Sequence, residues 1–101
     1  MKNLEYRTDK DIIYISLEGR IDASNAAEVE KEINAVRKAN EGMHTVLDAD
    51  TLEYISSAGL RVLLGAQKKM KQKGLMKVIN VCENVMEVLE MTGFADILTI
   101  E

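Results

Sequence analysis

The residues that could carry out chemistry are few and lie far apart in the sequence. The 101 residues include one histidine, His44, and one cysteine, Cys82, which fall in different predicted segments. Nucleophilic catalysis needs a base beside the nucleophile, so this pattern does not favour a catalytic pair. Asp48 and Asp50 follow a predicted strand, but two carboxylates alone are too few ligands for Mg²⁺ or Ca²⁺. We therefore expect a protein that is not an enzyme and has no catalytic residue, metal site or cofactor.

Two adjacent serines form the most informative motif. Ser56 and Ser57 precede Ala58 and Gly59, where a helix is predicted to begin. The free N–H groups and the positive dipole end of a helix N-terminus suit an anion such as phosphate. The alternative is that Ser57 only caps the helix. Gly59 favours the anion, because a glycine in a helix costs up to about 1 kcal/mol relative to alanine and suggests that some group must approach closely.

Charge and hydropathy exclude several classes of partner. The formal net charge is -4 and aromatic residues make up 4% of the chain, which argues against direct binding to nucleic acid. The one basic cluster is interpreted as the solvated end of a helix: Lys68, Lys69, Lys71 and Lys73. No apolar run approaches the roughly 18 residues of a membrane span, so we expect no membrane insertion. A single cysteine excludes an internal disulfide and suits the cytoplasm.

The elements that must position the serines follow a βαβ pattern. Strands are predicted at residues 4–8, 12–17, 44–48, 76–81 and 97–100, and helices at 26–39, about 58–73 and 84–93. Gly19 to Asp22 is expected to end the second strand, and residues 49–55 to form a loop. Apolar spacing predicts these inward residues on the two long helices: Ala26, Val29, Ile33, Val36, Val62, Leu63, Ala66 and Met70. The order predicts one domain, 1–101, of the α/β class with mostly parallel strands.

Two segments of the chain resemble the STAS domain family, and in particular its anti-sigma factor antagonists. The longer segment runs from Val46 to Leu64 and contains Tyr-Ile-Ser-Ser-Ala-Gly-Leu, and the shorter is Leu-Glu-Gly-Arg-Ile-Asp, ending at Asp22. The resemblance covers essentially the whole chain. It implies the STAS fold, a mixed, mostly parallel β-sheet with helices packed mainly on one face. It also implies that Ser57 is the phosphorylated serine, with the Asp22 turn beside it.

One departure from the family pattern concerns the residue before the phosphate acceptor. Many members regulated by a kinase have aspartate there, whereas this chain has Ser56. Ser56 is therefore a second candidate acceptor. The resemblance implies these partner-binding residues: Asp22, Ser56, Ser57, Ala58, Gly59, Leu60 and Leu64. From the helical pattern, Leu60 and Leu64 are expected to be partly exposed at the edge of the inward stripe.

The function implied by the resemblance is a switch in transcription. The unphosphorylated protein would bind an anti-sigma factor that is also a serine kinase and so release a sigma factor, and phosphate on Ser57 would end that binding. ATP and Mg²⁺ would be bound by the partner kinase only, and a serine phosphatase would reset the switch. The protein itself would be a monomer when free.

Two alternative functions remain open. One is a STAS accessory subunit of an ABC-type or anion transport complex, which would bind an ATPase stably and carry no phosphate. The other is a small-ligand-binding STAS module, which would have a defined pocket between the Asp22 turn and Ser57.

Overall fold

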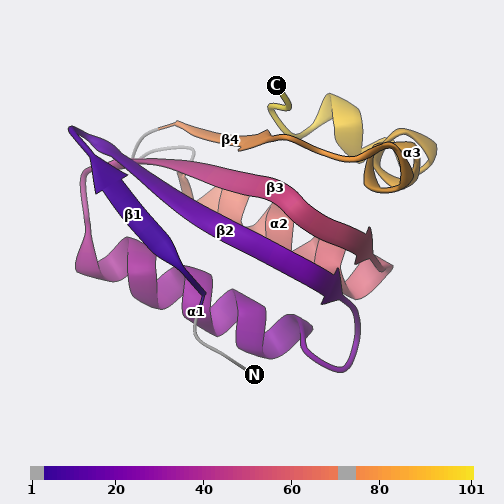
Figure 1. Cartoon of the computed structure of the whole chain (residues 1–101), viewed down its shortest axis with the longest axis horizontal. Coiled ribbons are helices and arrows are strands. Elements are labelled where there is room, and N and C mark those ends of the chain that lie inside the picture. The colour runs from indigo at the N-terminus through magenta and orange to yellow at the C-terminus, as the bar shows by residue number, and fades with distance from the viewer. Residues whose placement is uncertain (1–3, 71–74) are drawn as a thin grey trace.

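The computed structural model describes residues 4–70 and 75–101. These residues form a sheet of four strands in the order β1-β2-β3-β4, with β1 antiparallel to β2 and the other neighbours parallel (Figure 1). The predicted mixed, mostly parallel sheet is therefore confirmed. The elements in chain order are β1 (Tyr6–Asp9), β2 (Ile12–Ile21), α1 (Ala26–Ala39), β3 (His44–Ile55), α2 (Ser57–Met70), β4 (Met76–Ile79), α3 (Glu83–Met91) and a short 3-10 helix, η1 (Phe94–Asp96).

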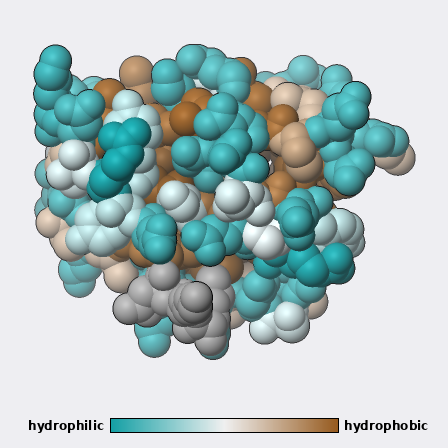
Figure 2. Space-filling view, in the orientation of Figure 1, coloured by the Kyte–Doolittle hydropathy of each residue, from teal (hydrophilic) through white to brown (hydrophobic). Residues whose placement is uncertain are grey.

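The two long helices pack on one face of the sheet and bury the side chains that the spacing predicted. Along β2, buried and more exposed residues alternate, as expected for a strand with one face on the core. All the predicted inward residues are buried: Ala26, Val29, Ile33, Val36, Val62, Leu63, Ala66 and Met70. The predicted end of the second helix, residues 71–73, and Gly74 lie outside the described residues. In the view of Figure 2, polar side chains cover most of the surface, and hydrophobic side chains show between them.

The parallel topology brings the two helix N-termini to one end of the sheet. The chain leaves the carboxyl ends of β2 and β3 and enters α1 and α2 at that end (Figure 1). The Asp22 turn and the serine pair are far apart in the sequence but therefore lie close together in the fold. They lie at the carboxyl ends of parallel strands, which is where α/β sheets usually bind their ligands.

Two of the predicted strand boundaries were wrong. β2 continues through Gly19 to Ile21, and residues 49–55, predicted as a loop, continue β3. Gly19 has a φ of 63°, and the β2–β3 pairing shifts register between Ser16 and Glu18 and again between Gly19 and Arg20. These β-bulges absorb the extra residues of β3. Residues 17–21 of the shorter motif and 46–55 of the longer one thus lie on paired strands rather than in loops.

The C-terminal prediction was only partly right. α3 buries Val85 and Leu89. Residues 97–100 were predicted as a strand, but the structure has a single bridge between Val78 and Ile100, and part of the segment before it forms η1.

Candidate functional site

The start of α2 separates the roles of the two serines. Ser56 caps the helix: its Oγ accepts a hydrogen bond from the Gly59 N–H at 3.4 Å, and its carbonyl accepts one from the Leu60 N–H at 2.9 Å. Ser57, which the sequence offered as the cap, is instead the first helical residue. It is exposed, and its hydroxyl has no hydrogen-bond partner among the described residues. Ser57 is therefore the more accessible hydroxyl of the pair.

Position 59 holds a glycine because neighbouring protein atoms leave no room for a Cβ there. A Cβ at this position would lie 2.6 Å from Ile55 Cγ1 and 2.8 Å from Ile21 Cγ2, and 3.0 Å from the Ile21 carbonyl oxygen. The idea that Gly59 makes room for an approaching phosphate is thus not needed to explain this residue. The glycine allows the first turn of α2 to pack directly on the ends of β2 and β3.

The structure corrects the predicted exposure of Leu60. Its side chain is only 2% exposed and belongs to the core, whereas Leu64 and Ala58 are half-buried. The inward surface of α2 is wider than the predicted stripe, because the helix packs against both the sheet and α1. Leu60 is therefore a core residue and offers no side-chain surface to a partner, whereas part of Leu64 remains accessible.

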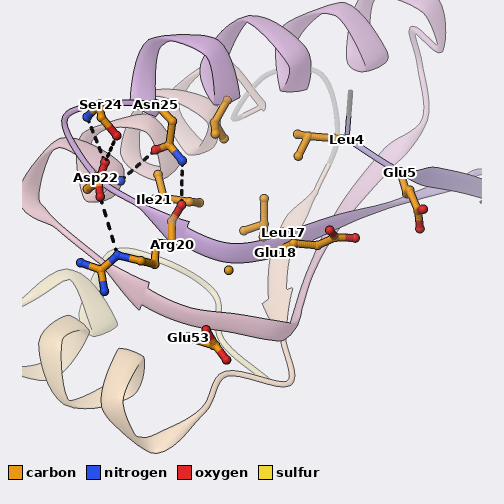
Figure 3. Close-up of a pocket in the computed structure, with 12 residues that line it drawn as sticks. Leu4, Glu5, Leu17, Glu18, Arg20, Ile21, Asp22, Ser24, Asn25 and Glu53 are labelled. Carbon is orange, nitrogen blue, oxygen red and sulfur yellow. Dashed lines mark hydrogen bonds and ion pairs between the residues drawn. The ribbon is translucent and has the colours of Figure 1, made fainter. Parts of the chain in front are cut away.

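The Asp22 turn is ordered by its own side chains (Figure 3). The Asp22 carboxylate accepts hydrogen bonds from the backbone N–H and the hydroxyl of Ser24. These bonds, with the hydroxyl contributing most and Arg20 adding its positive charge, hold the pKa of Asp22 below its ordinary value. Asp22 is consequently a fixed negative charge at neutral pH.

Asn25 completes the edge of β2 beside this carboxylate. Its Nδ2 donates to the Arg20 carbonyl at 2.8 Å, and its Oδ1 accepts from the Asp22 N–H at 2.9 Å. The side-chain amide thus pairs with the strand as a neighbouring peptide group would. Although Asn25 directly precedes α1, it makes no side-chain cap hydrogen bond to that helix.

The ends of β2 and β3 bring the predicted site residues together. Ile21 pairs with Ile55, and the Ser56 N–H donates to the Ile21 carbonyl at 2.9 Å. Asp22 and Ser57, which follow these residues, therefore lie at adjacent strand ends.

Arg20 and Tyr54 are two site residues that the sequence analysis did not identify. The Arg20 guanidinium lies over the Tyr54 ring, 4.4 Å from its centroid, and its Nε is 3.8 Å from Asp22 Oδ2. Both residues belong to the two motifs, and each precedes a predicted site residue, Asp22 or Ser56, by two positions. That spacing was available in the sequence, but the register that pairs Arg20 with Tyr54 was not.

An open groove of about 670 Å³ lies beside the Asp22 turn (Figure 3). Apolar side chains such as Leu17 and Val29 line it together with the acidic Glu18 and Glu53. The groove reaches Asp22, but neither serine of the α2 start lines it. It therefore differs from the pocket between Asp22 and Ser57 that would mark a small-ligand-binding module.

The other chemically active residues lie apart from one another. His44 begins β3 and accepts a hydrogen bond at Nδ1 from the Leu75 N–H, whereas Cys82 Sγ contacts the carbonyl of Leu52 near the other end of that strand. Within residues 4–70 and 75–101, no group of three or more histidine, cysteine, aspartate or glutamate side chains could hold a metal ion. In the same part of the chain, no helix has the length and hydrophobicity to cross a membrane.

The chain belongs to the STAS domain family, because the family model described as STAS domain matches residues 3–101. It is 34% identical over 94 residues to an anti-sigma-B factor antagonist of Listeria monocytogenes, covering 92% of this chain and 82% of that protein. The family resemblance found in the sequence is confirmed.

Two solved structures share the fold. A crystal structure of an anti-sigma factor antagonist from Mycobacterium paratuberculosis has a TM-score of 0.85 at 21% identity, covering 96% of this chain and 82% of that one. The Bacillus cell fate determinant SpoIIAA in its phosphorylated form has a TM-score of 0.69 at 15% identity, covering 97% of this chain and 90% of that one. At these identities the similarity establishes the fold.

Proposed function

We propose that this protein is an anti-sigma factor antagonist that is switched by phosphate on Ser57. The observation that carries the proposal is the exposed Ser57 hydroxyl on the first turn of α2, beside the fixed charge of Asp22. The name of the Listeria relative supports the functional class. Without phosphate the protein binds an anti-sigma factor that is also a serine kinase, and a sigma factor is released. It acts in the cytoplasm as a binding protein rather than an enzyme, while ATP and Mg²⁺ are bound by the kinase and a serine phosphatase removes the phosphate.

The physics of the helix start explains how one phosphate can end binding without unfolding the domain. A phosphate adds about -1.5 to -2 charges at neutral pH. At a helix N-terminus an anion is stabilised by about 0.3 to 2 kcal/mol. The first turn of α2 itself has no acidic side chain, so the like charge that such a phosphate meets is Asp22, at the adjacent strand end. In a closed protein interface the same charge loses its hydration, which costs several kcal/mol. At about 1.4 kcal/mol per tenfold in affinity, partner binding weakens by a factor of hundreds or more.

Phosphate transfer tests the acceptor. The purified protein is incubated with the serine-kinase anti-sigma factor of its own organism, ATP and Mg²⁺, and peptide mass spectrometry should locate one phosphate on Ser57. Ser57→Ala should abolish incorporation. Ser56→Ala is the matched control, which should still accept phosphate although it loses the helix cap. Phosphate on Ser56 alone, or undiminished incorporation in Ser57→Ala, contradicts the proposal.

Ser57→Asp separates charge from folding. We expect this variant to lose binding to the same kinase while its thermal midpoint stays within a few degrees of wild type, because a carboxylate suits the helix start. A midpoint far below wild type would mean that the switch works by local unfolding. Stable binding to a transporter ATPase with no phosphate incorporation would favour the accessory-subunit alternative.

A further inference from the structure

An aromatic side chain is exposed beside the candidate switch. Among the described residues, the large hydrophobic side chains that remain exposed are Tyr6, Tyr54, Leu75, Met91 and Ile97. Tyr54 is 40% exposed and precedes Ser56 by two residues at the end of β3. Of these side chains, it is the one that the strand register places next to the Asp22 turn, through its partner Arg20. Tyrosine and arginine are enriched among the residues that contribute most to binding at protein interfaces.

The Arg20 side chain is ordered by its neighbours, yet some of its N–H donors remain accessible to a partner. Its guanidinium lies over the Tyr54 ring, 4.4 Å from the centroid, and its Nε is 3.8 Å from Asp22 Oδ2. The side chain is nevertheless 63% exposed, and the other two nitrogens point away from Asp22 (Figure 3). A guanidinium has five N–H donors in a planar fork that matches a carboxylate. Because the stack and the ion pair already order the side chain, little freedom remains to be lost on binding.

We propose that the Arg20–Tyr54 stack is the anchor of the partner interface, and that the partner places a carboxylate against Arg20 and apolar atoms against the exposed part of Tyr54. This inference rests on the proposed function and assigns to these two residues the role first expected of Leu60. The two Arg20 nitrogens that point away from Asp22 are the donors that would receive this carboxylate. Phosphate on Ser57, two residues after the last residue of β3, would repel such a carboxylate as well as resist burial, so one partner group accounts for both binding and release.

Matched pairs of variants test the anchor. Tyr54→Ala and Arg20→Lys are titrated against the serine-kinase anti-sigma factor of the same organism by calorimetry, and both are melted. We expect each to weaken binding by about tenfold or more, since lysine keeps the charge but loses the planar stack and fork. Tyr6→Ala and Arg7→Lys are the controls. Tyr6 is 50% exposed, and Arg7 lies over the Tyr14 ring at 4.0 Å in another part of the sheet. Both controls should bind within twofold of wild type.

The outcomes distinguish this inference from the proposed function. Suppose that wild type binds and Ser57→Asp does not, but that Tyr54→Ala and Arg20→Lys both bind within twofold of wild type. This result would contradict the Arg20–Tyr54 anchor and would still support the proposed Ser57 switch. If wild type does not bind at all, both the anchor and the proposed function are contradicted. Should Tyr54→Ala melt well below wild type, Arg20→Lys decides, since it preserves length and charge at an exposed position. Equal losses in Arg20→Lys and Arg7→Lys would also overturn the anchor.

Discussion

The two ends of the sheet carry the same kind of ring contact in different surroundings. At one end Arg20 lies over Tyr54, beside Asp22 and the starts of α1 and α2. Toward the other end Arg7 lies over Tyr14 near the β1–β2 hairpin. An arginine stacked on a tyrosine is therefore not enough to mark a functional site in this chain. The first end differs because the exposed hydroxyl of Ser57 and the ionised carboxylate of Asp22 lie beside the stack.

The helices give the two ends opposite electrostatic character. Where α1 and α2 end, their last turns carry basic residues: Arg37, Lys38, Lys68 and Lys69. These cations complement the negative dipole ends of the helices. A phosphate added at the start of α2 meets the positive end of a dipole instead. A charge switch can thus be placed at the Ser57 end without weakening the fold.

The largest expected effect is a loss of stability when the core beneath the start of α2 is emptied. Leu60→Ala empties a fully packed position and should lower the free energy of unfolding by about 2–5 kcal/mol in denaturant titration. Leu64→Ala, on the same helix but half-buried, should lose less. Full stability in Leu60→Ala together with weakened partner binding would return Leu60 to the exposed surface predicted from the sequence.

The close packing at the start of α2 can be compared with the middle of the same helix. Gly59→Ala drives a methyl group into Ile55 and Ile21 and should destabilise the fold by about 1–3 kcal/mol. At Gly65 the nearest atom to an added Cβ is Glu30 Oε2 at 3.7 Å, so Gly65→Ala should stabilise by up to about 1 kcal/mol. Thermal or denaturant unfolding of both variants measures the difference. The same sign for both would mean that Gly59 is not constrained by packing.

Asparagines at the two ends of α1 give the next comparison. Asn25→Ala removes the two hydrogen bonds that complete the edge of β2 and should cost about 1–2 kcal/mol of unfolding free energy. Asn40→Ala removes one bond, from Nδ2 to the Val36 carbonyl at 2.8 Å, and should cost about 0.5–1.5 kcal/mol. Because Asn25 holds the Asp22 turn, partner affinity should fall in Asn25→Ala alone. Equal partner affinities of Asn25→Ala and Asn40→Ala would mean that the Asp22 turn is not part of the interface.

The smallest expected effect is a pH dependence at Asp22. Its pKa is lower in the folded protein than the ordinary 3.8, so its ionised form stabilises the fold. That contribution should be complete above about pH 4 and should disappear as the pH falls through the lowered folded value. Ser24→Ala removes the largest cause of the shift and should move the pKa of Asp22 upward, as NMR titration can measure. An unchanged pKa in Ser24→Ala contradicts this explanation.

The sequence by itself determined the class of fold, the inward residues of both long helices and the family. Apolar spacing along a helix is a local pattern, so Val29 and Leu63 could be placed without knowing their neighbours. The serine pair stood out from its residue types and its place before a predicted helix, whereas Asp22 was named only through the family resemblance.

The tertiary structure decided which side chains at the site are accessible and which ones meet. The cap belongs to Ser56 rather than Ser57 because the Ser56 N–H pairs with Ile21 and fixes where the helix can begin. Leu60 is buried because α2 packs on α1 as well as on the sheet, which a single helical stripe cannot reveal. Arg20 meets Tyr54 only through a parallel register that contains two bulges. Pairing between distant strands depends on the whole sheet, so no local pattern in the sequence could have specified it.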